Sequence, residues 1–422
     1  MDLQEHILDL GRRARAAARV LSGLTTEQKN VALLAMSDAL EAQREQILAA
    51  NARDVANATS ASLSAALVDR LTLNEQRLRG MAEAVRAEAE LPGPVGEVIR
   101  DWTRPNGIRI EKKRVAIGVV ATIYESRPNV TSDAAALCIK TGNAIILRGG
   151  SEAIHSNTAI AAALQEGCAT AGLPSDSILL VAGTDRASVR LLAEMDRYID
   201  VIVPRGGEAL IDAVVSHARM PVIKHSSGLC CIYVDKAADL AMAEQIVLNA
   251  KTQRPGVCNA AETLLVHRDV AGPFLQRLAR TCGAAHVELR CDDSSFAQLS
   301  AEGYPRLKRA AEADWNTEFL DLILAVRVVD SDTAAIEHIE RHGSHHSDCI
   351  VTADAATAER FLNSVDSAVV YWNASTRFTD GAEFGFGAEM GISTGKIGVR
   401  GPMGLEELTT YKYVIRGTGH VR

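Results

Sequence analysis

The chain has 422 residues, of which 47% are hydrophobic, and its 45 basic and 53 acidic residues give a net charge of −8. This length is enough for two or three domains with large cores. The net negative charge argues against a nucleic-acid partner, because nucleic acids are bound by basic surfaces. No apolar stretch reaches the ~18 residues of a membrane span. A signal peptide begins with basic residues and continues with an apolar run, and the first residues of this chain do not follow that order. For both reasons we expect a cytoplasmic protein with no membrane partner.

The eight cysteines are scattered and show neither a Cys-x-x-Cys pair nor a zinc-like spacing. They are Cys138, Cys168, Cys230, Cys231, Cys258, Cys282, Cys291 and Cys349. In a large chain without a secretory signal, reduced thiols are expected, and most should be buried as small apolar side chains. His345 and His346 lie near His342, but adjacent side chains point apart on a helix or strand, whereas metal ligands must converge. We therefore expect no metal site.

The first ~90 residues predict helices, because strong helix formers dominate them. Residues 91–96, Leu-Pro-Gly-Pro-Val-Gly, end this helical region. Residues 108–114 then alternate apolar and charged side chains, as a two-faced strand does. Residues 115–123 are almost wholly apolar, which is typical of a strand buried on both faces.

Strands and helices then alternate. Further short apolar runs, predicted as strands, lie at 144–147, 177–181 and 199–203. Segments with helical character lie between and after them at 153–171, 188–195 and 208–217. Strand and helix at this spacing predict a parallel α/β sheet.

A second series of the same kind follows. Its predicted strands lie at 230–234, 263–267, 322–329 and 349–352. Its predicted helices lie at 240–251 and 273–282. This series predicts a second α/β domain. The weak alternation at 408–414 indicates a strand that pairs with another element of the chain or with another subunit.

The usual nucleotide-binding motifs are missing. No Gly-x-Gly-x-x-Gly follows a predicted strand, and residues 391–396 are one residue short of a phosphate-binding loop and lack its hydroxyl. Instead, three turns follow apolar runs, at 125–131, 148–152 and 204–208. Each alone is consistent with an ordinary strand-to-helix turn. Together they favour a ligand, because ligands bind beyond the carboxyl ends of parallel strands and helix starts attract anions.

Residues 253–260, Gln-Arg-Pro-Gly-Val-Cys-Asn-Ala, form a polar loop between a predicted helix and a predicted strand. A cysteine in such a loop can be exposed at a cleft, and a nucleophilic sulfur must be accessible and prone to ionise. Spacing alone leaves two interpretations of Cys258 open, a nucleophile or a buried structural cysteine.

This loop is one of several segments that resemble the γ-glutamyl phosphate reductase family of the aldehyde dehydrogenase superfamily. The others are 124–129, 140–143, 148–151, 204–207, 373–381 and 401–413. The resemblance runs nearly end to end. It implies NADPH-dependent reduction of L-glutamyl 5-phosphate to L-glutamate 5-semialdehyde with release of phosphate, the second step of proline biosynthesis from glutamate. Cys231 departs from the family, in which histidine is expected at this position.

The implied fold is aldehyde-dehydrogenase-like α/β, with two Rossmann-like parallel-sheet domains and a small oligomerisation element. An NADP-binding domain would take residues 1–99 and 115–225, and a catalytic domain residues 226–399. Residues 100–114 and 400–422 would form the oligomerisation element. The resemblance further implies a homo-oligomer and a functional association with glutamate 5-kinase.

The resemblance also implies roles for single residues. Cys258 matches the nucleophile that forms a thioester, and Asn129 matches the side chain that faces the developing oxyanion; Asn129 as a turn former is the alternative. Arg148 stands where related enzymes carry a ribose-binding lysine, and Ser151 where NAD-preferring relatives carry glutamate. A guanidinium without that carboxylate favours the 2′-phosphate of NADPH. We therefore expect NADPH to be preferred over NADH, an interpretation that takes the turn with Arg148 and Ser151 to lack a nearby acid.

The remaining cofactor and substrate contacts are implied in the same way. Gly206 and Gly207 resemble the turn that meets the pyrophosphate, and Glu318 falls near the glutamate that holds the nicotinamide ribose. The substrate's carboxylate and phosphate need cations, for which the candidates in the matched loops are Arg127, Arg254 and Arg377. Glu125 or Asp380 would hold its ammonium group. Each of these charges is equally consistent with a surface residue.

The sequence disfavours two rival functions. An oxidative aldehyde dehydrogenase would carry a glutamate general base before the cysteine loop, but residues 222–227 read Val-Ile-Lys-His-Ser-Ser. A binding or scaffold protein with an inactive site is disfavoured by the presence of Cys258, Asn129 and Arg148 together.

Overall fold

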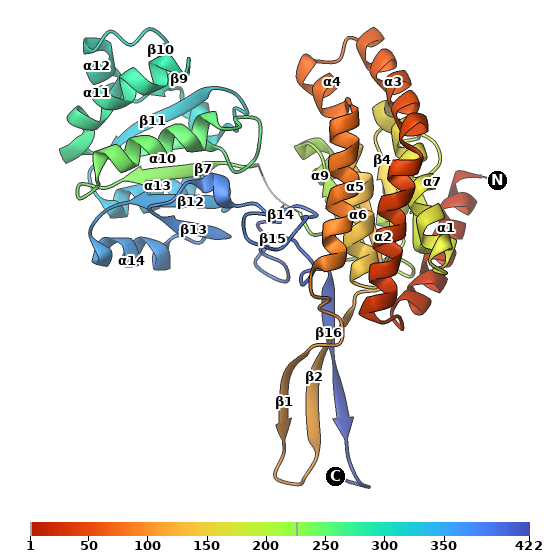
Figure 1. The fold of residues 1–422 in the computed structure, drawn as a ribbon. Helices are drawn as coiled ribbons and strands as arrows, with labels where there is room; N and C mark the ends of the chain where they lie inside the picture. The colour runs from red at the N-terminus through yellow and green to blue at the C-terminus, as the bar shows by residue number, and fades with distance from the viewer. Residues whose placement is uncertain (1, 225–226) are drawn as a thin grey trace. The chain divides into compact units, whose positions relative to one another are not determined.

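The computed structural model describes residues 2–224 and 227–422. They form two compact units (Figure 1). The first comprises the residues up to 224 together with 385–391 and 403–422, and the second comprises the residues from 227 to 384 together with 392–402. No helix in the described part of the chain is long and apolar enough to cross a membrane.

The helical start predicted from composition is confirmed. The described helices are α1 (Leu3–Leu21), α2 (Thr26–Ala42), α3 (Arg44–Ser60), α4 (Ala65–Leu71) and α5 (Glu75–Glu90). The α2 helix begins with a capping box. The Thr25 hydroxyl accepts from the Gln28 N–H at 3.3 Å, and the Gln28 side chain accepts from the Thr25 N–H at 2.9 Å. These two bonds satisfy donors that the first turn of a helix leaves unpaired.

The first unit contains a parallel sheet with the strand order β5-β4-β3-β6. Its strands are β3 (Val119–Tyr124), β4 (Ala144–Gly149), β5 (Ile178–Leu180) and β6 (Val201–Arg205). The connecting helices are α6 (Asn129–Lys140), α7 (Ile154–Thr170) and α8 (Ala187–Ala193), and α9 (Glu208–His217) follows the last strand. Every residue of β3 and β4 is buried, as the continuous apolar runs predicted.

The prediction of one strand over residues 115–123 is wrong. The chain forms β2 (Arg109–Ala116), breaks at Gly118, and starts β3 in a different sheet. Gly118 has a φ of +132°, and a Cβ there would clash with the carboxylate of Asp200. The same Asp200 carboxylate accepts from the Val119 N–H at 2.8 Å. A glycine is therefore needed where the chain passes between the two sheets.

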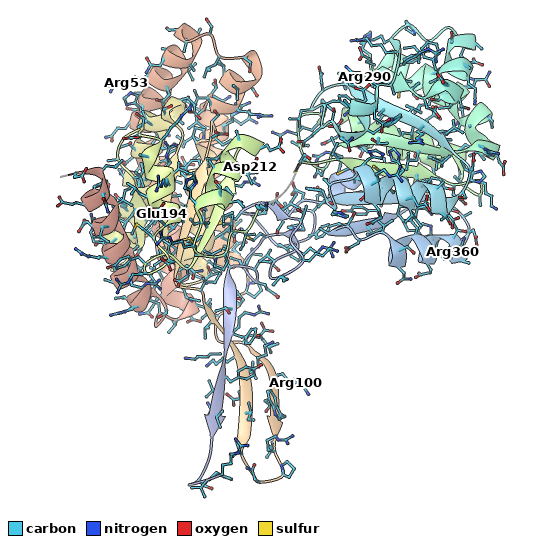
Figure 2. The ribbon with its side chains drawn as sticks, turned by 180° about the vertical axis from the view of Figure 1, so that it is seen from behind. Arg53, Arg100, Glu194, Asp212, Arg290 and Arg360 are labelled. Atoms are coloured by element: carbon cyan, nitrogen blue, oxygen red, sulfur yellow. The ribbon has the colours of Figure 1, made fainter. Side chains whose placement is uncertain are left out.

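A three-stranded antiparallel sheet with the order β1-β2-β16 also belongs to the first unit. Its outer strands are β1 (Val98–Thr103) and β16 (Thr409–Arg416), and β16 pairs with β2 from Thr409 opposite Ala116 to Arg416 opposite Arg109. Figure 2 shows Arg100 projecting from this sheet. The chain's last strand therefore pairs with an element of its own chain, which was one of the two alternatives predicted for it.

The second unit is built on a parallel sheet with the order β10-β9-β11-β8-β7-β12-β13. Its strands are β7 (Cys230–Val234), β8 (Ala261–His267), β9 (Glu288–Cys291), β10 (Leu307–Arg309), β11 (Ile323–Val329), β12 (Ser347–Val351) and β13 (Val369–Trp372). A short hairpin joins β14 (Ile392–Ser393) to β15 (Gly401–Pro402).

Helices cover both faces of this sheet (Figure 1). One core contains residues of α10 (Leu240–Thr252), α11 (Arg268–Ala284) and α12 (Asp293–Ala301). The other contains residues of α13 (Asp332–His342) and α14 (Ala355–Ser364). The helix predicted to begin at Pro273 begins at Arg268, because the His267 ring accepts from the Asp269 N–H at 3.2 Å and caps it earlier.

Candidate active site

The second unit carries Cys258 in the connection between α10 and β8, where the sequence predicted an accessible loop. Cys258 is partly exposed, whereas the other seven cysteines are buried. Burial raises the pKa of the Cys168, Cys282, Cys291 and Cys349 thiols to about 12. Burial also raises the pKa of the remaining three buried thiols. Among the eight thiols, Cys258 is therefore the accessible candidate nucleophile.

The backbone around Cys258 is held by close packing and hydrogen bonds. Gly228 lies so near that a Cβ on it would clash with backbone atoms of Cys258. Below the loop, the Cys230 thiol donates to the Cys258 carbonyl at 3.2 Å. The Asn259 side chain donates to the Thr379 carbonyl at 2.8 Å, and the Thr376 hydroxyl donates to the Asn259 carbonyl at 2.7 Å. Such support fixes the geometry of a reactive side chain before substrate binds.

Three of the predicted substrate residues gather around this loop. Arg377 donates to the side chain of Asn259 and, through Nε, to that of Gln253 at 2.8 Å. Burial lowers the pKa of Arg377 and the positive charge of Arg254 lowers it further, whereas Asp380 and Cys258 raise it. Arg254, Asp380 and Cys258 therefore lie near enough to Arg377 for their charges to shift its pKa.

A layer of polar side chains under the loop was not predicted. The Ser347 and Thr379 hydroxyls lie 2.7 Å apart, and the Tyr371 hydroxyl lies 2.8 Å from that of Thr379. The His346 ring lies 2.9 Å from the Ser347 hydroxyl and 3.7 Å from the Cys230 sulfur. These residues come from distant parts of the sequence, so no spacing could have indicated them.

Cys231, the departure from the family pattern, lies in β7 and is buried. Its N–H donates to the Asp348 carboxylate at 2.8 Å, and burial raises the pKa of Asp348 to about 6.

In the first unit, Asn129 is exposed and begins α6. Its amide donates to the Asp133 carboxylate at 2.9 Å, and burial raises the pKa of Asp133 to about 6. Because an amide nitrogen carries two hydrogens, one remains for a further acceptor. The geometry suits the predicted oxyanion donor and suits a helix-start residue equally.

Arg148 is buried at the end of β4. Its guanidinium donates to the Gly149 carbonyl at 3.2 Å and to the Ser188 hydroxyl at 3.3 Å. The expectation that this turn lacks a carboxylate is wrong, because Glu152 follows the exposed Ser151 directly. The Glu152 carboxylate accepts from the Ser126 hydroxyl at 2.7 Å, and its charge raises the pKa of Arg148 against the lowering by burial.

Gly206 and Gly207 lie between β6 and α9, so the turn is where the sequence predicted it. The Gly207 N–H donates to the Glu125 carboxylate at 3.0 Å, and a Cβ on Gly206 would clash with that same carboxylate. Glu125 therefore lies at the start of α9 within the first unit. Arg127 is partly buried and follows β3.

Glu318 lies in the second unit beside a buried ion pair. The Lys251 ammonium is 2.7 Å from the Glu262 carboxylate, and both side chains are 0% exposed. Burial raises the pKa of Glu262 to about 7 against the lowering by Lys251, and Glu318 contributes to the increase.

Comparisons with known proteins place the chain in a family. The aldehyde dehydrogenase family model matches residues 4–301. A curated relative from Moorella thermoacetica, named gamma-glutamyl phosphate reductase, is 55% identical over 100% of both chains. A relative of the same name from Opitutus terrae is 54% identical over 100% of this chain and 99% of its own. The chain belongs to the γ-glutamyl phosphate reductase branch of the aldehyde dehydrogenase family.

Solved structures of family members agree with this assignment. The γ-glutamyl phosphate reductase structure from Thermotoga maritima is 44% identical, has a TM-score of 0.95 and covers 99% of this chain and 100% of its own. An acetylating aldehyde dehydrogenase from Geobacillus thermoglucosidasius is 19% identical, has a TM-score of 0.70, covers 100% of this chain and 98% of its own, and so shows the fold alone. The predicted α/β fold of the aldehyde dehydrogenases, with its parallel sheets, is confirmed.

Residues 222–227, in which the sequence offers no carboxylate as a general base, are described only in part, because residues 225 and 226 lie outside the described residues. Within residues 2–224 and 227–422, no three His, Cys, Asp or Glu side chains are grouped as metal ligands.

Proposed function

We propose that this enzyme reduces L-glutamyl 5-phosphate to L-glutamate 5-semialdehyde with NADPH and releases phosphate, through a thioester on Cys258. This reaction is the second step of proline biosynthesis from glutamate. The observation that carries the proposal is the accessible thiol of Cys258, set in a braced loop while seven other thiols are buried. The enzyme name of the full-length relatives supports the substrate.

In the first step the Cys258 thiolate attacks the acyl carbon of the substrate, and phosphate leaves with the electron pair of the broken C–O bond. An acyl phosphate is already activated, so this step needs no base to deprotonate water. The amide of Asn129 and the N–H of Cys258 would face the oxyanion, and each such donor lowers a barrier by ~3–4 kcal/mol in known enzymes. When bound, NADPH supplies the hydride that reduces the thioester. Cys258 then leaves as thiolate when the aldehyde forms.

The residues of the first unit fit a dinucleotide phosphate. Arg148, with Ser151, would hold the 2′-phosphate, and Gly206 with Gly207 would meet the pyrophosphate. The Gly207 N–H already holds an anionic oxygen, that of Glu125, at 3.0 Å. The start of α9 is therefore suited to a negative charge. Glu318 of the second unit would hold the nicotinamide ribose.

Charge supports the assignment of the substrate's polar groups. Arg254 and Arg377 lie near Cys258 and would bind carboxylate and phosphate, and Asp380 would hold the ammonium group. Arg127 is a further cation for these anionic groups. Glu125 is the alternative to Asp380, and its hydrogen bond to Gly207 argues for Asp380.

The antiparallel sheet of β1, β2 and β16 would join subunits of a homo-oligomer. It exposes large side chains that alternate along β16 and so share one face of the sheet, with Tyr411 48%, Tyr413 55% and Ile415 62% exposed. Exposed apolar patches of this kind mark interaction surfaces. Sedimentation of Ile415→Asp against the wild type tests this, and an unchanged oligomer would contradict it.

One absorbance assay tests the proposed reaction. L-Glutamyl 5-phosphate is generated in the cuvette by glutamate 5-kinase from glutamate and ATP, and NADPH oxidation is followed. We expect oxidation that needs the kinase, ATP and Cys258, and little NAD reduction with simple aldehydes. Cys258→Ser is the inactive control and Cys231→Ser its matched active control. Rapid NAD reduction by simple aldehydes without NADPH oxidation would favour an oxidative aldehyde dehydrogenase instead.

A further inference from the structure

A pocket of about 200 Å³ lies in the second unit between the carboxyl-terminal half of β11 and one face of α13. Its charged and titratable lining residues are Arg327, Asp330, Glu337, His338, Arg341 and His342. The pocket is separate from the nucleophile. Arg327 pairs in register with Leu265 of β8, whereas Cys258 precedes the first residue of β8, Ala261. Leu265 lies four positions after Ala261 along the strand, or about 13 Å from it.

Positive charge in this pocket lacks a fixed counter-charge. Neither Arg327 nor Arg341 forms an ion pair with a carboxylate in the described part of the chain. Asp330, the acidic residue at the end of the strand, pairs with Arg268. The guanidinium of Arg327 lies over the ring of Trp315, with its carbon 5.7 Å from the ring centre. The pocket therefore joins two guanidinium groups with two histidines, against the carboxylate of Glu337.

His338 adds a buried donor whose acceptor is missing. The Arg327 Nη1 lies 3.2 Å from the His338 Nδ1, and because a guanidinium only donates, Nδ1 must accept. The proton of the neutral ring is therefore on Nε2. His338 is 5% exposed, and its Nε2 has no hydrogen-bond partner among the described residues. Trp315 packs edge-to-face on the ring at 5.4 Å, but an indole nitrogen offers no lone pair.

Burial and the neighbouring positive charges keep the His338 ring neutral, and the same positive charges favour the binding of an anion. Burial, followed by the charges of His342, Arg327 and Arg341, lowers the pKa of His338 to about 3. Burial also lowers the pKa of His342, which Glu312 raises in part. The His342 Nδ1 donates to the side-chain oxygen of Asn316 at 3.1 Å. A negative oxygen in the pocket would face the guanidinium groups and could accept from His338.

We propose that this pocket binds a small oxyanion, a phosphate or carboxylate group, at a site separate from Cys258. Guanidinium groups bind both kinds of anion through paired N–H donors. The Nε2–H of His338 would supply a neutral donor beside them. Glu337 would oppose binding, because its carboxylate lines the same pocket. The chain has 3 tryptophans, and Trp315, which contacts both His338 and Arg327, reports on the site.

The test uses the full chain with Trp102→Phe and Trp372→Phe, so that Trp315 is the remaining tryptophan. Inorganic phosphate and glutarate are titrated separately at constant ionic strength, with chloride as the reference salt, and tryptophan fluorescence is followed. We expect a saturable change with at least one of the two anions. Tighter binding of phosphate would identify a phosphate site, and tighter binding of glutarate a carboxylate site.

Three variants in this background locate the response. Arg341→Gln should weaken binding about tenfold or more, because it removes a charge-assisted contact, and Glu337→Gln should tighten it. Arg360→Gln is the matched control. Arg360 lies on α14 (Figure 2), is exposed, and pairs with Asp332 at 2.8 Å outside the pocket. A response that chloride reproduces, or that neither pocket variant alters, would overturn the proposal, as would the absence of a saturable response to both anions.

Discussion

Alkylation of the folded enzyme should select one thiol of the eight. Iodoacetamide reacts with thiolates, and the structure leaves Cys258 partly exposed while it buries the other seven cysteines. We expect Cys258 to be modified first and NADPH oxidation to be lost at the same rate.

The size of this selectivity follows from the pKa values of the buried thiols. At pH 7.5, raising the pKa of a thiol from the ordinary ~8.5 to about 12, as burial does for Cys282, lowers its ionised fraction roughly three thousandfold. A less acidic thiolate is the stronger nucleophile, which recovers ~1.5 orders of magnitude. Roughly a hundredfold difference in rate remains, before the lack of access to a buried sulfur is counted.

The assay is timed alkylation, followed by mass spectrometry of the cysteine peptides and a parallel activity measurement. Denatured protein, in which all eight thiols should react at similar rates, is the control. The reasoning is refuted if Cys230 or another buried cysteine reacts as fast as Cys258 in the folded protein. It is also refuted if activity survives full modification of Cys258.

Three further sets of substitutions test separate parts of the account. Cys258→Ala should abolish turnover but leave folding and NADPH binding intact, whereas Cys231→Ala should retain activity; a similar loss in folded Cys231→Ala would contradict the assignment. Arg148→Glu should weaken NADPH binding at least about tenfold more than NADH binding, since a hydrogen bond to a charged group contributes ~1.5–3 kcal/mol. Fluorescence titrations measure both affinities, and equal weakening of the two cofactors would argue against a 2′-phosphate contact. Lys251→Met should lower the free energy of unfolding, measured in urea, by ~3–5 kcal/mol, because it leaves Glu262 buried without its partner. Adding Glu262→Leu should recover most of the lost stability. A loss below ~1 kcal/mol in Lys251→Met would show that another group compensates the Glu262 carboxylate.

Much of the fold was predictable because its strands are buried on both faces. Continuous apolar runs located β3 and β7, and the polar Pro-Gly loop before β8 located Cys258. The break at Gly118 was missed because the apolar run continues across it, and only the neighbouring Asp200 shows why the chain must turn there.

The sequence indicated individual residues of the candidate site, but few of the contacts between them. Glu152 is visible in the sequence beside Ser151, but its hydrogen bond to Ser126 depends on how two turns approach each other. The hydroxyls of Ser347 and Thr379 are 32 residues apart in the chain and meet only through the fold. Similarly, Arg327 and His338 form their contact because α13 packs back on β11.

The dependence of the reverse reaction on phosphate tests the central claim most directly. In the reverse direction, glutamate semialdehyde loses hydride to NADP and leaves an acyl group on Cys258. Water removes this group slowly unless a positioned base takes its proton, and the sequence of residues 222–227 offers no carboxylate for that role. Phosphate should therefore be required to release the acyl group.

The measurement is NADPH formation from the semialdehyde and NADP, with and without phosphate, at a semialdehyde concentration corrected for its cyclic imine. We predict continued turnover with phosphate, and without it a single turnover per site with little free glutamate. Sustained turnover in phosphate-free buffer, with glutamate as the product, would show that a general base activates water and would contradict the proposed thioester exchange with phosphate.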